Sequence, residues 1–240
     1  MLTETTTSSA AVWSSGVRVV ATAVFAIAIV AFLVTSGVRW VTLGQRFYVD
    51  EFARYHVGRV TGLSDAELAR VAQAFIVYFE SPSGRLDVVV NLPQGPTQLL
   101  NEREITHMQD VQALMHRVFA IWTASILALL VSGLLLVVAE PSSGGRAVLI
   151  ASAIGGGLAI LIVGALGAAS MIDFERLFVQ FHMLSFTNDF WLLDPLRDRL
   201  IQLYPEGFFY DAALRIALET VGGGLILLAA SLVGLRSLAR

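Results

Sequence analysis

Residues 118–139, VFAIWTASILALLVSGLLLVVA, and residues 147–172, AVLIASAIGGGLAILIVGALGAASMI, decide the fold that this sequence predicts. Neither stretch contains a charged residue, and only the short segment 140–146 separates them. A helix needs about 20 mainly apolar residues to cross a bilayer, because lipid offers its backbone groups no hydrogen bonds. The two stretches therefore predict two membrane-spanning helices joined by a short loop.

Two further stretches complete the predicted spans. Residues 19–38 are uncharged, and residues 220–235 are uncharged but short, so we expect the last span to cover 212–235. That span includes Arg215 and Glu219, whose spacing favours an interfacial ion pair over a functional charge inside the membrane. With 56% hydrophobic residues and a mean hydropathy of +0.72, the sequence predicts an all-α membrane protein with four transmembrane helices.

The ends of these spans predict the orientation of the chain. Four arginines share one side of the membrane: Arg18, Arg146, Arg236 and Arg240. Because cytoplasmic loops carry an excess of basic residues, we expect this side to be cytoplasmic. The cytoplasmic parts are then a tail over 1–18, the loop 140–146 and the tail 236–240. Residues 1–15 of the first tail are rich in serine and threonine and are expected to be loose. The connections 39–117 and 173–211 lie outside, and the cytoplasmic membrane is the expected location.

Composition excludes several classes of function. A net charge of -3 and an isoelectric point near 5.8 leave no basic stripe for nucleic acid. The absence of cysteine excludes disulfides and thiol chemistry within this chain. The glycine runs at 155–157 and 222–224 favour close helix packing over a phosphate loop, because no strand precedes them.

The outside segment 39–117 predicts a small, mostly helical extracellular cap. Ser64 and Glu67 form a capping box before apolar residues at helical spacing, which predicts a helix that ends before residues 81–84. Residues 86–92 predict a short strand.

The segment 101–111, NEREITHMQDV, is the first of two motifs with useful chemistry. Asn101 followed by Glu104 predicts a helix start, and the helix is expected to run directly into span 118–139. One face of this helix carries four polar side chains: Arg103, Glu104, His107 and Asp110. Carboxylates at this spacing can orient an imidazole and stabilise its protonated form.

The second motif is 181–209, FHMLSFTNDFWLLDPLRDRLIQLYPEGFF, in which aromatic residues surround polar groups. The candidate site residues in it are Phe181, His182, Phe186, Asn188, Asp189, Trp191, Asp194 and Asp198. His182 follows the third span at about the distance by which His107 precedes the second, so the two histidines are expected at matching heights, about 15 Å beyond the hydrocarbon. Phe174, Leu177, Phe178 and Phe181 predict an apolar stripe that lies in the membrane interface.

These two motifs resemble the bacterial integral membrane family that includes the lipoprotein intramolecular transacylase. The resemblance rests on Arg103-Glu104-Ile105, His107-Met108, Asp110-Val111, Phe181-His182, Phe186, Asn188-Asp189, Trp191, Leu193-Asp194-Pro195, Asp198, Leu200-Ile201, Pro205 and Phe208-Phe209. Gln112 departs from the lysine that the family pattern leads us to expect, and Tyr204 departs from phenylalanine.

The resemblance implies an acyltransferase that acts on diacylglyceryl-modified lipoproteins at the membrane lipid surface. The sn-2 acyl chain would move to the α-amino group of the N-terminal cysteine, giving a lyso-form lipoprotein. By the same resemblance His107 and His182 match the catalytic pair, beneath the extracellular cap, and neither a metal nor another cofactor is expected.

This chemistry fits what the chain lacks, because the substrate brings its own nucleophile and no G-x-S-x-G motif is present. Proton transfer from an amine of pKa about 8 to an imidazole of pKa about 6.5 costs only about 2 kcal/mol. One hypothesis is that His107, backed by Glu104 and Asp110, takes this proton. His182, with Asn188 or Arg103, would then stabilise the oxyanion and protonate the glyceryl oxygen; the opposite assignment is equally allowed. Aromatic confinement is expected from Phe181, Phe186, Phe190, Trp191, Phe208 and Phe209.

Other functions remain open at this point. A zinc-dependent membrane hydrolase would draw its ligands from His107, Asp110, His182 and Asp189, although no strong zinc spacing is present. A transporter is disfavoured by the uncharged first three spans. A noncatalytic assembly factor would use the cap to bind a partner. Structural readings also exist for Asp194 as a turn, Asp110 as an ion-pair partner of Arg103, and Trp191 as an interfacial anchor.

Overall fold

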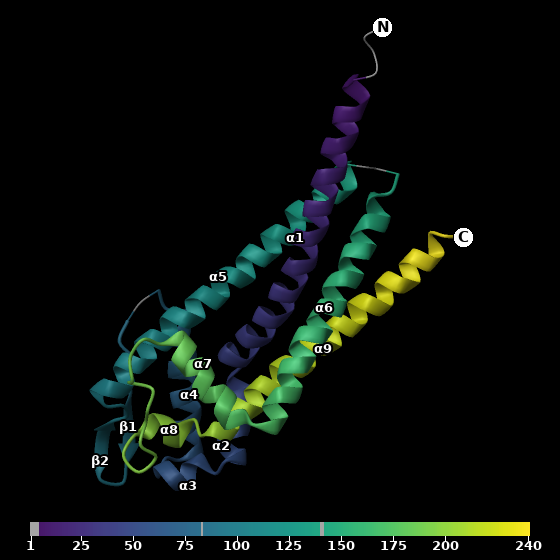
Figure 1. Cartoon of the computed structure of the whole chain (residues 1–240). Coiled ribbons are helices and arrows are strands. Elements are labelled where there is room, and N and C mark those ends of the chain that lie inside the picture. The colour runs from purple at the N-terminus through teal and green to yellow at the C-terminus, as the bar shows by residue number, and fades with distance from the viewer. Residues whose placement is uncertain (1–4, 83, 140–141) are drawn as a thin grey trace. The chain divides into compact units, whose positions relative to one another are not determined.

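A computed structural model describes residues 5–82, 84–139 and 142–240 of the chain. Four of its helices are long and apolar enough to cross a membrane (Figure 1). They are α1 (Thr5–Leu43), α5 (Glu102–Ala139), α6 (Gly144–Ile172) and α9 (Glu206–Ser237). The prediction of an all-α protein with four spans is confirmed. Helix α1 already begins at Thr5, so most of the segment expected as a loose tail is helical.

The chain divides into two compact units. The first comprises Met1–Gly37, Ala120–Leu166 and Ala217–Arg240, and the second comprises Val38–Phe119 and Gly167–Ile216. The first unit consists mainly of apolar helices, and the second contains the cap together with both histidine motifs.

Within the first unit, glycines let two helices approach closely. A Cβ atom added to Gly156 on α6 would lie 2.7 Å from the carbonyl oxygen of Gly224 on α9, and one added to Gly224 would lie 2.8 Å from the carbonyl oxygen of Gly156. Small residues allow such backbone contact between helices in lipid, where packing replaces the hydrophobic effect. The prediction of close helix packing is confirmed at Gly156 and Gly224, whereas a Cβ atom added to Gly157 or Gly222 would meet nothing within 4 Å.

The second unit contains the short elements. They are α2 (Gln45–Arg54), α3 (Val57–Thr61), α4 (Asp65–Glu80), β1 (Val89–Leu92), β2 (Gly95–Gln98), α7 (Phe174–Ser185) and α8 (Arg199–Leu203). The strands form an antiparallel pair with Val89 opposite Gln98 and Leu92 opposite Gly95. The expected strand is thus present over the second half of its predicted range, while α2, α3 and β2 are additions that the sequence pattern did not indicate.

Helix α4 is fixed at both ends by side chains. At its start, Ser64 Oγ accepts a hydrogen bond from the Glu67 backbone N–H at 3.3 Å, as the capping box predicts. At its end, the Gln112 side-chain amide donates to the Tyr78 carbonyl oxygen at 2.6 Å, and His116 Nε2 lies 3.1 Å from the Phe79 carbonyl oxygen. Helix α5 therefore satisfies the last carbonyls of α4, which a helix leaves without partners of its own.

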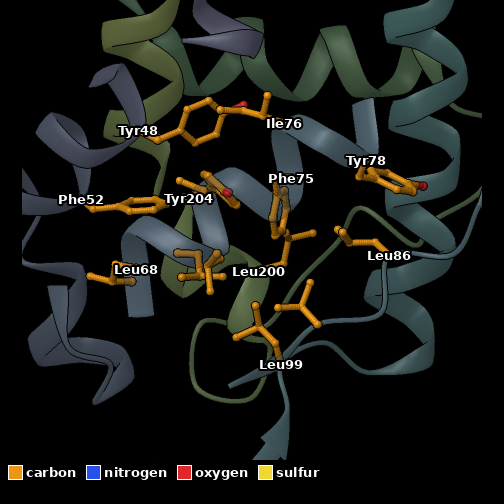
Figure 2. Packing of buried hydrophobic residues seen from close by; sticks show 14 of the residues in the cluster. Tyr48, Phe52, Leu68, Phe75, Ile76, Tyr78, Leu86, Leu99, Leu200 and Tyr204 are labelled. Atoms are coloured by element: carbon orange, nitrogen blue, oxygen red, sulfur yellow. The ribbon is translucent and has the colours of Figure 1, made fainter. Parts of the chain in front are cut away.

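Aromatic rings form much of the core of the second unit (Figure 2). Phe75 of α4 packs on Tyr204 with ring centroids 5.1 Å apart, and Tyr204 packs on Phe52 of α2 at 5.5 Å. Burying such rings removes large apolar areas from water and ties the cap to the residues that follow the second motif. The cap is therefore a folded core rather than a loose connection.

Candidate active site

Helices α5 and α7 bring two histidines together. The ring centroids of His107 and His182 are 6.1 Å apart, and both residues are buried, with 6% and 7% of their surfaces exposed. The structure thus brings two residues that are far apart in the chain together within the second unit.

The start of α5 depends on Glu104, which is fully buried. Its backbone N–H donates to Asn101 Oδ1 at 3.0 Å, and its carboxylate accepts from the Asn101 N–H at 2.7 Å. The other carboxylate oxygen accepts from the Leu200 N–H at 2.6 Å, at the start of α8. One carboxylate therefore satisfies the first turns of two helices. The expectation that Glu104 orients His107 is not met, because the hydrogen bonds of Glu104 within the described residues go to Asn101 and Leu200.

Asp110 also has a partner other than His107. Its carboxylate accepts from Asn188 Nδ2 at 2.8 Å, and Asn188 Oδ1 accepts from the Phe190 N–H at 3.1 Å. These bonds tie the loop after α7 to α5. His107 Nδ1 is buried and makes no hydrogen bond within the described residues.

His182 is held in one tautomer. Its Nδ1 lies 2.8 Å from the Phe178 carbonyl oxygen. Because a carbonyl only accepts, Nδ1 must carry the hydrogen, and Nε2 of the neutral ring keeps a free lone pair. Burial lowers the pKa of His182 from its usual value. The ring is therefore neutral near pH 7 and able to accept a proton at Nε2.

Aromatic rings enclose the two imidazoles. The centroid of Phe178 lies 4.2 Å from that of His182, and Trp191 lies at 4.9 Å with an interplanar angle of 32°. Phe186 contacts both imidazoles, at 5.1 Å from His107 and 5.6 Å from His182. Phe181 meets His182 edge-on at 5.3 Å. Such walls limit the motion of a bound group.

Arg103 fixes the loop that carries Trp191. One of its guanidinium nitrogens donates to the carbonyl oxygens of Asp189 at 2.8 Å and Leu192 at 2.6 Å. Asp189 thus enters this contact through its backbone. The two acceptors lie on either side of Trp191 in the sequence, so Arg103 ties the loop at this residue to α5.

Asp194 and Asp198 shape the same loop further along. Asp198 accepts from Asn101 Nδ2 at 2.9 Å and from the Asp194 N–H at 2.7 Å. Asp194 accepts from the Leu196 N–H at 2.9 Å, which is the turn that the Asp-Pro pair predicts. Both carboxylates therefore hold the backbone of residues 194–198 in place. This part of the loop lies further along the chain than either histidine.

Some predicted wall residues lie elsewhere. Phe208 packs in the cap core, 5.3 Å from Phe47, while Phe209 lies behind Phe178 at 5.1 Å. Phe190 is 40% exposed and stacks on neither imidazole. Phe178 is a wall residue that the sequence does not predict, because its spacing favours the apolar stripe at the membrane interface. Its position four residues before His182 was the available signal, because residues at that spacing adjoin on a helix.

Among the residues that the structure describes, no three His, Cys, Asp or Glu side chains gather in an arrangement that could hold a metal ion. Of the four ligands considered for zinc, Asp110 binds Asn188 instead, and Asp189 contacts Arg103 through its carbonyl.

Comparison with known proteins gives a consistent result. The family model described as lipoprotein intramolecular transacylase Lit matches residues 23–209. The structure of the membrane-integral lipoprotein intramolecular transacylase Lit from Bacillus cereus is 25% identical, with a TM-score of 0.78, over 93% of this chain and 98% of that chain.

Two variants of the Bacillus cereus protein are similar as well. The variant with one histidine changed to arginine is 25% identical with a TM-score of 0.73, over 95% of this chain and 97% of that chain. The variant with a histidine changed to alanine is 24% identical with a TM-score of 0.70, over 92% and 94%. No curated protein sequence matches the chain.

Proposed function

Because this chain belongs to the lipoprotein intramolecular transacylase family, we propose that it moves the sn-2 acyl chain of a diacylglyceryl-modified lipoprotein to the α-amino group of the N-terminal cysteine. The amine attacks the ester carbonyl, a C–N bond forms, and the ester C–O bond breaks. The products are an N-acyl cysteine and a free glyceryl hydroxyl. The observation that carries this proposal is the pair of buried imidazoles 6.1 Å apart inside an aromatic enclosure.

The proposed location follows from the charges at the helix ends. Arg18, Arg146 and Arg236 mark the cytoplasmic side, which puts both termini in the cytoplasm and the cap on the extracellular face of the cytoplasmic membrane. The proposed substrates are lipoproteins whose diacylglyceryl group anchors them in the outer leaflet. The substrate and the site would then share one surface with the membrane lipids. No nucleic acid takes part in the proposed reaction.

We assign the proton transfer to His182. Its Nδ1 is bonded to the Phe178 carbonyl, so Nε2 is the basic atom. Nε2 accepts the proton of the attacking amine, and the resulting imidazolium donates it to the departing glyceryl oxygen. One proton thus moves from nitrogen to oxygen, and the histidine is restored. This reverses our first hypothesis, in which His107 was the base, because Glu104 bonds to Asn101 and Leu200 instead of supporting His107.

His107 then has the task of stabilising the oxyanion. Its neutral ring has one N–H, and its Nδ1 makes no hydrogen bond within the described residues. A buried group without a partner is unfavourable until a ligand supplies one. The developing negative charge on the ester carbonyl oxygen would accept a hydrogen bond from this N–H, and in a buried site such a bond contributes strongly.

Trp191 offers a second donor. Its indole ring lies along His182, and its Nε1–H has no hydrogen-bond partner within the described part of the chain. Asn188 and Arg103, which were expected to contact the oxyanion, donate to Asp110 and to loop carbonyls instead. We therefore propose that Trp191 donates to the reacting carbonyl, while Arg103 positions Trp191.

The experiment expresses the protein in a host that lacks its own N-acylating enzymes. Mass spectrometry of lipoprotein N-termini should find the lyso form with the native protein and none with His107→Ala or His182→Ala at equal protein levels. His56→Asn is the matched control, because His56 is exposed and its left-handed backbone suits asparagine. Lyso product from both alanine variants would refute the assignment, and its absence with the native protein would favour the noncatalytic assembly role.

A further inference from the structure

Two grooves lie on opposite faces of α1 in the first unit, and they differ in charge. One, between α1 and α6, has a cavity volume of about 550 Å³. We call it the arginine groove, and it is lined by Arg18, Thr22, Ala23, Arg146, Ile150 and Ile154, among others. The other, between α1 and α5, has a volume of about 630 Å³. We call it the apolar groove, and its lining includes Val17, Val20, Val24, Val131 and Leu135.

The arginine groove combines two kinds of surface. Arg18 and Arg146, from different helices, lie toward one end of its two walls, and the residues one to two turns further along each helix are small or aliphatic. Arginine binds phosphate through paired N–H donors, and basic pockets between membrane helices recognise acidic lipid head groups. Aliphatic walls between spans suit an acyl chain.

We propose that the arginine groove binds one anionic phospholipid, with its phosphate between Arg18 and Arg146 and an acyl chain along Ala23 and Ile154. The residues of this site belong to the first unit, whereas both histidines belong to the second unit. The excess of arginine at the cytoplasmic span ends does not by itself require this lipid site, because a basic residue at a span end need not face a groove. Arg236, in the last turn of α9, has the same position in the pattern but lines neither groove.

The test measures lipid retention on the full-length protein. The purified protein is exchanged into an equal mixture of phosphatidylglycerol and phosphatidylcholine, and bound lipids are counted by native mass spectrometry. We expect several-fold preferential retention of one phosphatidylglycerol. Arg18→Gln with Arg146→Gln should bring the ratio close to one, whereas Arg236→Gln should leave it unchanged. Equal retention of both lipids by the native protein, or an unchanged ratio in the double variant, would overturn the proposal.

Adjacent residues on α1 give a second, charge-independent pair of variants. Ala23 lines the arginine groove, and Val24 lines the apolar groove on the opposite face. Ala23→Phe should fill the arginine groove and reduce phosphatidylglycerol retention with both arginines intact. Val24→Phe should not reduce it. If the two variants retain the anionic lipid equally, binding occurs by general surface attraction and the groove assignment is wrong.

Discussion

At the scale of single residues, the two histidines have similar burial but different surroundings. His182 is bonded to a backbone carbonyl, so its tautomer is set before any substrate arrives. His107 has a buried nitrogen without a partner among the described residues, so its hydrogen-bonding capacity is left for a ligand. This difference suggests separate tasks, with a prepared base at His182 and a donor at His107.

The first prediction concerns Trp191. Trp191→Phe keeps an aromatic ring against His182 but removes the indole N–H. Because losing one donor to an oxyanion typically lowers kcat by about 100-fold or more, we expect a loss of that order with little change in KM. Purified protein and a diacylated lipopeptide provide the measurement. Phe190→Leu, in the same loop, should have little effect, and a Trp191→Phe variant with native kcat would disprove the donor role.

The second prediction concerns pH. Burial lowers the pKa of His182, so its ring becomes protonated only below its usual value of about 6.5. The substrate amine, with a pKa of about 8, must also be neutral. The logarithm of kcat/KM should therefore fall with a slope of one below about pH 8, and the slope should steepen to two only below about pH 6.5. Steepening above that value would contradict the assignment of His182 as the base.

At the scale of helices and loops, the start of α5 shows what local sequence can and cannot predict. Asn101 and Glu104 are three residues apart, so their reciprocal capping bonds follow from the sequence alone. The bond from Glu104 to Leu200 joins distant parts of the chain, and no periodicity indicates it. For that reason the sequence predicts a contact between this carboxylate and His107, a polar side chain on the same helical face.

The third prediction tests this junction. Glu104→Ala removes a buried acceptor that serves the Asn101 and Leu200 N–H groups, and we expect a loss of about 1–3 kcal/mol in unfolding free energy. Glu102→Ala is the matched control, because its side chain is 80% exposed and its ion pair with Arg85 lies in solvent, where such a pair contributes little to stability. Limited proteolysis at increasing temperature monitors the unfolding of the cap and measures the stability of both variants. Equal melting of the two variants would show that the junction adds no stability.

At the scale of the whole molecule, the sequence predicts secondary structure best where the surrounding lipid restricts the folds that the chain can adopt. The spans at 118–139 and 147–172 were predictable because lipid leaves an uncharged stretch of that length few folds besides a helix. The short helices α2 and α3 were not, since tertiary packing of Phe52 and Val57 stabilises them more than their own pattern does. The sequence predicts Phe208 in the site although it lies in the core, because aromatic residues are common in both places.

The contact between α6 and α9 gives the last prediction, which concerns the stability of the first unit. Gly156→Val would place a Cβ atom 2.7 Å from the Gly224 carbonyl oxygen, a backbone atom that cannot move without shifting α9. Gly157→Val meets nothing within 4 Å and carries the same intrinsic helix effect, so the difference between the two variants isolates the helix contact. We expect Gly156→Val to lower the melting temperature in detergent or lipid, by several degrees relative to Gly157→Val. Equal melting temperatures would mean that the two backbones are not in contact there, and that the glycines serve another purpose.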